Sequence, residues 1–127
     1  MPKGLKKPKK PSKTTLKNKA DTLFAQLIRE KGYCQLKGLD NITCGGSLQC
    51  CHIIGRGNKR LCYDFLNALS CCKGHHVWYT HHPWEWHELT KKHFGKNYEY
   101  VNKHREEKVY NVDYQEIIEK LKNLKAT

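Results

Sequence analysis

Seven cysteines lie between Cys34 and Cys72, and histidines are interleaved with them. Their number is odd and the N-terminus lacks the apolar stretch of a secretory signal, so a secreted disulfide framework is not indicated. In a reducing cytoplasm, thiolates and imidazoles at this density are typical of zinc, which holds them in a tetrahedral shell. We therefore expect at least one structural Zn²⁺ to fasten this part of the chain.

The expected ligands of this structural zinc are three cysteines and one histidine: Cys34, Cys44, Cys72 and His75. Cys72 and His75 form a C-x-x-H pair, and this spacing favours Cys72 over the neighbouring Cys71. Nine residues separate the other two ligands, where about two to four are usual. The long separation is the unusual part of the predicted site.

The length and the charge of the chain limit the functions that it can have. The 127 residues suffice for one small domain with an appendage, and the formal net charge is +12. Eight lysines fall between Lys3 and Lys19, where there is no Asp or Glu. This balance favours a polyanionic partner, with nucleic acid first and an anionic membrane a distant second. No apolar run approaches the ~20 residues that cross a bilayer, so we expect a cytoplasmic protein without a membrane partner. The oligomeric state is not indicated.

The expected fold class is small α+β. Residues 1–13 are predicted to be a disordered basic tail and residues 14–127 one domain. A helix should follow a cap at Thr14 or Thr15 and end at Gly32. The core, about residues 44–82, should be zinc-stapled and contain two strands, at 48–54 and 59–65, and a short helix from near Cys72.

The C-terminal third, residues 83–125, is predicted to be helical. Pro83 suits a first helical position and Gly95 a stop. Asn97 is expected to cap a second helix through about residue 108, and Asp113 with Glu116 to cap a last one.

His52, Asn67 and His76 follow one another at separations of fifteen and nine residues. A neutral imidazole titrates near pH 6.5, so His52 can accept a proton from water at neutral pH as a general base. The Asn67 amide, in the intervening loop, is expected to tie the backbone down and hold the His52 ring. His76 is expected to bind a metal.

Three stretches carry a family resemblance: residues 48–56, Tyr63-Asp64-x-x-Asn67, and Cys72-x-x-His75-His76. They resemble HNH endonucleases and, more narrowly, the phage recombination nucleases of the lambda NinG (Rap) type, over about residues 16–125. The resemblance implies a ββα-metal core, in the host cytoplasm if phage-encoded. It also implies metal-assisted hydrolysis of DNA, on branched recombination or replication intermediates, leaving 5′-phosphate and 3′-hydroxyl ends.

The resemblance also implies one catalytic divalent metal, Mg²⁺, Mn²⁺ or Zn²⁺, held by His76. In such enzymes the residue before the general base is usually Asp or His and is the second ligand, but here it is Cys51. A thiolate would favour Zn²⁺. Alternatively, Cys50 belongs to the structural zinc and the second ligand is His81 or His82. The residues leave both assignments open.

Arg56 follows His52 by four residues, and its planar guanidinium suits a phosphate. Lys59 and Arg60 are expected to add contacts to the DNA backbone. The rival interpretation is a non-catalytic zinc-finger adaptor that binds nucleic acid, in which His52 and His76 complete a second structural metal site. A closed second site with four ligands would favour the adaptor.

Overall fold

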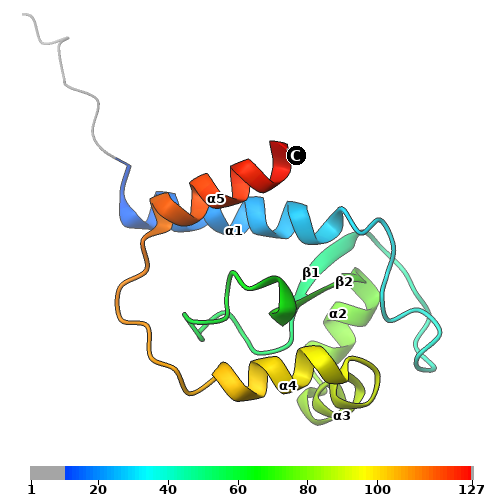
Figure 1. The fold of residues 1–127 in the computed structure, drawn as a ribbon. Helices are drawn as coiled ribbons and strands as arrows, with labels where there is room; N and C mark the ends of the chain where they lie inside the picture. Colours follow the sequence, from blue (N-terminus) through cyan, green and yellow to red (C-terminus); the bar gives the residue numbers. More distant parts are fainter. Residues whose placement is uncertain (1–10, 127) are drawn as a thin grey trace, which may run out of the picture.

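The computed structural model describes residues 11–126, which form five α-helices, a two-stranded sheet and one short 3₁₀ turn (Figure 1). In chain order they are α1 (Lys13–Arg29), β1 (Leu48–His52), η1 (Phe65–Asn67), β2 (Ala68–Cys72), α2 (Lys73–Thr80), α3 (Pro83–His93), α4 (Gly95–His104) and α5 (Tyr114–Ala126). The expected α+β class is confirmed. Most of the expected disordered tail, residues 1–10, lies outside the described residues.

Helix α1 starts earlier than expected because Ser12 caps it. The Ser12 hydroxyl accepts a hydrogen bond from the Thr15 backbone N–H at 3.1 Å. The helix then ends at Arg29, three residues before Gly32. Its apolar face packs against α5, and the two helices lie side by side in Figure 1.

The sheet is antiparallel, with Leu48 opposite Cys72 and His52 opposite Ala68. The first strand starts at Leu48 as expected but ends at His52, and the second strand expected at 59–65 is wrong. All five residues of β2 are buried, so this strand has no alternation of polar and apolar residues from which to detect it.

Residues 53–67 form a looped connection between the strands in place of a tight hairpin. Successive turns close between Gly55 and Asn58, Asn58 and Leu61, and Leu61 and Asp64. The Asp64 carboxylate then caps η1 by accepting the Leu66 backbone N–H at 3.0 Å. The loop therefore returns the chain to β2 through consecutive turns closed by its own backbone hydrogen bonds.

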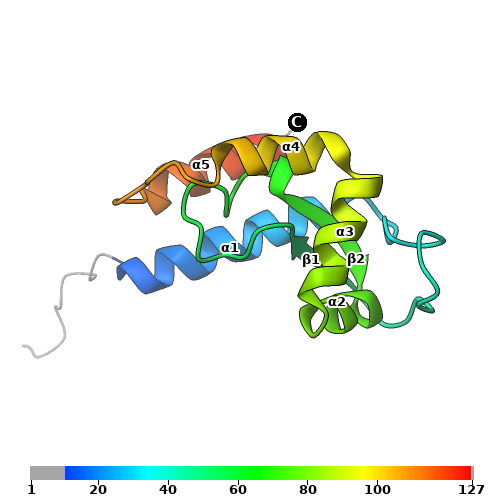
Figure 2. The ribbon, with the colours of Figure 1, turned by 90° about the horizontal axis from the view of Figure 1, so that it is seen from below.

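Two layers of helices cover the sheet. On one face, Phe24 of α1 and Leu121 of α5 pack with Cys50 and Ala68. On the other face, the side chains of β1 and β2 pack with those of α2 and α3; this second cluster contains Cys51, Leu69, Cys71, Tyr79 and Leu89. Figures 1 and 2 show α2 and α3 beside the strands, at one end of α1. The register places the start of α2, directly after Cys72, beside the start of β1, where the Lys73 backbone N–H donates to the Ser47 carbonyl at 2.9 Å.

The C-terminal helices follow the expected order with shifted boundaries. Helix α3 begins at Pro83 as predicted, but α4 begins at Gly95 because Asn97 is no cap: its amide donates to the Leu66 carbonyl at 3.0 Å. Asp113 caps α5 by accepting the Glu116 backbone N–H at 3.1 Å. Within residues 11–126 no helix has the length and apolar character needed to cross a membrane.

Candidate metal centre and candidate active site

The four expected zinc ligands come together in the structure. The ligand atoms of Cys34, Cys44, Cys72 and His75 all lie within 4.8 Å of one another. The Nδ1 atom of His75 faces the three sulfurs, at 3.7 Å from Cys34, 3.7 Å from Cys44 and 3.0 Å from Cys72. Among residues 11–126 this is the one cluster of Cys, His, Asp or Glu side chains compact enough to hold a metal ion.

The donor set fits Zn²⁺. With Zn–S bonds of about 2.3 Å and Zn–N bonds of about 2.0 Å, tetrahedral geometry separates the imidazole nitrogen from each sulfur by roughly 3.5 Å. The three distances from His75 Nδ1 to the sulfurs are 3.0 to 3.7 Å. Desolvation and the adjacent Cys34 and Cys72 thiols raise the pKa of Cys44 to about 11. Burial opposes ionisation of Cys72, but hydrogen bonds from His75 and Gly45 lower its pKa to about 6. Metal binding would deprotonate these thiols, and three sulfurs with one imidazole form a donor set that suits zinc.

Backbone contacts bring the first two ligands to the third. Gln35 binds β2 twice, since its backbone N–H donates to the Ser70 carbonyl and its side-chain oxygen accepts the Ser70 N–H, both at 2.8 Å. Gly45 accepts the Gly74 N–H at 2.9 Å and donates to the Cys72 sulfur at 3.4 Å. Gly46 has φ +81°, and a Cβ there would lie 2.8 Å from the Lys73 Cβ, so only glycine fits.

His52 ends β1, with its ring held on two sides. Nε2 lies 2.9 Å from the Cys62 carbonyl oxygen, and the ring stacks on Phe24 of α1 with centroids 5.6 Å apart. Because a carbonyl only accepts, Nε2 carries the proton and Nδ1 is the free acceptor. Burial lowers the pKa of His52 below its ordinary 6.5, and the positive charge of Arg56 acts in the same direction. The neutral imidazole therefore predominates at neutral pH.

Asn67 is fully buried and ties the loop down. Its amide oxygen accepts the Ile54 backbone N–H at 2.8 Å, and its amide nitrogen donates to the carbonyls of Ile54 at 2.9 Å and Leu61 at 3.1 Å. The expectation that Asn67 also holds the His52 ring finds no matching contact. Cys62 and Phe24 hold the ring instead.

His76 lies in the first turns of α2, where Gln49 of β1 holds its ring. Nδ1 lies 2.6 Å from the Gln49 amide oxygen. Because that oxygen only accepts, Nδ1 carries the proton and Nε2 is left as the ligand nitrogen. Burial and the charge of Arg56 lower the pKa of His76. Gln49 was not selected by the sequence analysis.

His52 and His76 line the same cavity of about 210 Å³, between the end of β1 and α2. Its other lining residues include Cys51, Ile53, Tyr79 and Trp86. The Trp86 indole N–H lies 3.2 Å from the carbonyl oxygens of both His52 and Ile53, and so fixes the backbone at the strand end. No Asp or Glu side chain lines the cavity in the described part of the chain.

The expected second ligand of a catalytic metal is not found. Cys51 forms a disulfide with Cys71, which projects from the same face of the neighbouring strand, so its sulfur is no thiolate ligand in this state. His81 and His82 do not line the cavity, and His82 Nδ1 bonds to the Trp78 carbonyl at 2.7 Å. Cys50 is a free buried thiol outside the zinc cluster. His76 is therefore a single candidate ligand, and this donor set does not fit a complete catalytic site.

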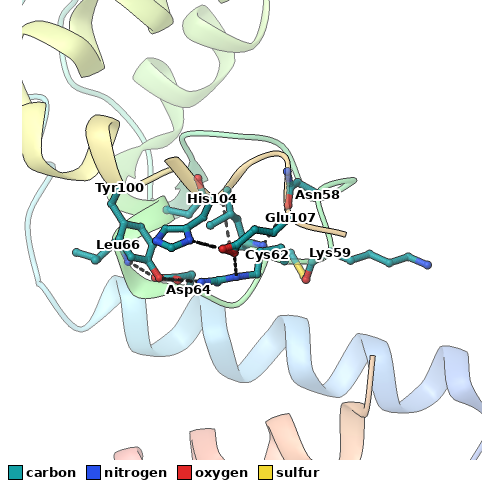
Figure 3. A network of polar contacts seen from close by, with 11 residues as sticks. Asn58, Lys59, Cys62, Asp64, Leu66, Tyr100, His104 and Glu107 are labelled. Atoms are coloured by element: carbon teal, nitrogen blue, oxygen red, sulfur yellow. Dashed lines mark hydrogen bonds and ion pairs between the residues drawn. The ribbon is translucent and has the colours of Figure 1, made fainter. Parts of the chain in front are cut away.

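The three expected DNA contacts divide into two kinds. Arg56 and Lys59 are exposed, and Figure 3 shows Lys59 extending away from a polar network. Arg60 belongs to that network: its guanidinium bonds to Glu107 at 3.1 Å, to Asp64 at 3.3 Å and to Tyr100 at 3.3 Å. Arg60 thereby fastens the loop to α4 and the segment after it, which does not favour it as a phosphate contact.

Comparisons of the chain with family models, with curated proteins and with solved structures find no match. The family resemblance therefore depends on the residues and spacings of this chain alone.

Proposed function

We propose that this protein hydrolyses phosphodiester bonds in DNA as an HNH endonuclease, with His52 as the general base. One observation carries the proposal: His52 and His76, selected by their spacing around Asn67, line one cavity. The intervening loop is held by the three hydrogen bonds of the Asn67 amide.

The chemistry assigned to His52 follows from its tautomer. The Cys62 carbonyl accepts from Nε2–H, so Nδ1 can take a proton from an attacking water. When the ring becomes an imidazolium, the same carbonyl stabilises the added charge. A positioned general base of this kind contributes typically about 10²–10⁴-fold to the rate.

A divalent metal enters the proposal only through His76. Family chemistry implies an ion that stabilises charge on the phosphate, and His76 Nε2 is the nitrogen left free to bind it. The lining of the cavity supplies no second ligand for this ion, so the metal dependence of cleavage has to be measured.

We assign substrate binding to positively charged side chains. Arg56 and Lys59 are exposed and come shortly after His52 in the sequence, and the net charge of +12 favours a polyanion. Contacts of this kind go to the phosphate backbone and carry little sequence information. Branched recombination or replication intermediates of a phage remain the proposed substrates, on the strength of the family resemblance.

A second candidate is the non-catalytic zinc-finger adaptor. The observation that favours it is that residues 11–126 contain one metal-binding group, the cluster of three cysteines and one histidine, and no second group to hold a catalytic ion. The closed second site with four ligands that was expected for the adaptor is not found among these residues either. An adaptor would bind nucleic acid and leave it intact.

The test uses zinc-loaded full-length protein with supercoiled plasmid and with a four-way DNA junction. Each substrate is incubated with Mg²⁺, Mn²⁺ or added Zn²⁺, and binding is measured in the same samples. The endonuclease predicts nicked or linear products with 5′-phosphate ends in at least one metal. Binding without cleavage in every metal would favour the adaptor and contradict the nuclease.

A further inference from the structure

Asp40 lies inside the nine-residue segment that separates the zinc ligands Cys34 and Cys44. Its side chain is only 12% exposed and makes three hydrogen bonds. One carboxylate oxygen accepts from His75 Nε2 and from the Ile42 backbone N–H, both at 3.0 Å. The other accepts from the Tyr79 hydroxyl at 2.5 Å.

These contacts determine which nitrogen of His75 faces the metal. A carboxylate accepts hydrogen bonds, so the proton of the His75 ring lies on Nε2, toward Asp40. The lone pair is then on Nδ1, the atom that faces the three cysteine sulfurs. The tautomer that binds zinc is thus the one that Asp40 selects.

We infer that Asp40 orients His75 as a zinc ligand, and that the long Cys34–Cys44 segment serves to deliver this carboxylate. The inference concerns the metal centre and does not depend on the proposed nuclease activity. Asp40 is a positioning residue, since it contacts the ligand and not the metal.

The folding of the segment supports this role. A turn closes between Cys34 and Lys37, and another between Leu36 and Leu39. Leu36 is fully buried in the cluster that contains the zinc cysteines. Gly38 has φ +82°, a conformation that favours glycine, two residues before Asp40. A separation of only about two to four residues would leave no room for this excursion.

Tyr79 connects the zinc centre to the cavity. Its hydroxyl holds one oxygen of Asp40, and its side chain lines the cavity that contains His52 and His76. His75 and Tyr79 lie on the same helix, with rings stacked 6.4 Å apart. The carboxylate therefore bridges two turns of α2 to the ligand segment.

The test compares Zn²⁺ affinity of full-length variants by competition with a chromophoric chelator. Asp40→Ala removes all three hydrogen bonds, and loss of such a partner typically weakens metal binding by about 10–100-fold. Asp40→Asn keeps an oxygen that can accept both the Ile42 N–H and the His75 Nε2–H, so it preserves the turn and the ring contact while removing the charge. The exposed Asn41→Ala variant is the matched control in the same segment.

We expect affinity to fall in the order wild type and Asn41→Ala, then Asp40→Asn, then Asp40→Ala. The Nε2–H proton of His75 should be visible by NMR in zinc-loaded wild type and Asn41→Ala. It should be lost in Asp40→Ala, because without the hydrogen bond it exchanges with water. Wild-type affinity in folded Asp40→Ala would make Asp40 a turn residue and overturn the inference, as would a wild-type protein that binds no zinc tightly. If Asp40→Ala fails to fold, Asp40→Leu, which is close in size to Asp and has no acceptor, takes its place in the comparison.

Discussion

At the scale of single residues, the candidate site depends on two histidines held in opposite tautomers. The Cys62 carbonyl places the proton of His52 on Nε2, whereas the Gln49 amide places that of His76 on Nδ1. Each ring keeps one free nitrogen, and both rings line the same cavity. The acceptors, and not the histidines themselves, decide which nitrogen is available.

Gln49→Leu should release this constraint on His76. The change removes the oxygen that accepts from Nδ1–H, so we expect a mixture of His76 tautomers where the wild type has one. The measurement is the ¹⁵N chemical shifts of the imidazole nitrogens, with Gln115→Leu on the exposed surface of α5 as control. A single, unchanged tautomer in Gln49→Leu would show that Gln49 does not set it.

Asn67→Ala should destabilise the fold strongly. It leaves the Ile54 N–H and the Ile54 and Leu61 carbonyls without their partner, and an unsatisfied buried group costs about 1–3 kcal/mol. We expect a loss of at least about 2 kcal/mol in urea denaturation at saturating zinc. Exposed Asn111→Ala serves as control, and an effect of Asn67→Ala as small as that of the control would contradict the bracing role.

At the scale of elements, α1 and the 53–67 loop support the site from outside it. Phe24 of α1 stacks on His52, and the Tyr63 hydroxyl donates to Asp21 of α1 at 2.6 Å. Arg60 fastens the other side of the loop to α4 and to Glu107. The general-base candidate is therefore positioned by elements distant in sequence.

Arg56 and Arg60 should respond differently to substitution by Ala. Arg60→Ala loses partly exposed ion pairs, so we expect about 1 kcal/mol of destabilisation and unchanged DNA binding. Arg56→Ala should leave stability unchanged, weaken DNA binding and reduce its log–log salt slope by about 1. Urea denaturation and binding across a salt series measure the two effects. The reverse pattern would reassign the two arginines.

The sequence predicted the elements that carry a local signal. These signals are the apolar stripe of α1, Pro83 at the start of α3 and the Asp113 cap of α5. Strand β2 was missed because it is buried on both faces and shows no alternation. The four residues of the candidate metal site could be selected by residue type and spacing.

Asp40 and Gln49 could not be selected in that way. Their partners lie 35 and 27 residues away in the chain, so only tertiary packing reveals the contacts. The Cys51–Cys71 bond was also missed, since it depends on the strand register that places both side chains on one face.

At the scale of the whole molecule, charge should dominate DNA affinity. Deleting residues 1–10 removes five lysines and spares the Ser12 cap of α1. If all five neutralise phosphates on duplex DNA, the log–log salt slope should shrink by up to about 4. Binding measured from low to high salt, for full-length and truncated protein of equal thermal stability, provides the comparison. An identical slope would place the affinity in residues 11–127 alone.

The most direct measurement of the central claim is the single-turnover cleavage rate of His52→Ala beside its DNA affinity. We predict a rate about 10²–10⁴-fold below wild type with unchanged binding, because the residue supplies proton transfer and little binding energy. Exposed His93→Ala on α3 is the matched control and should cleave normally. In the wild type the rate should fall with decreasing pH only below 6.5, since burial lowers the pKa of His52 and the base must be neutral. Full cleavage by His52→Ala would contradict the account.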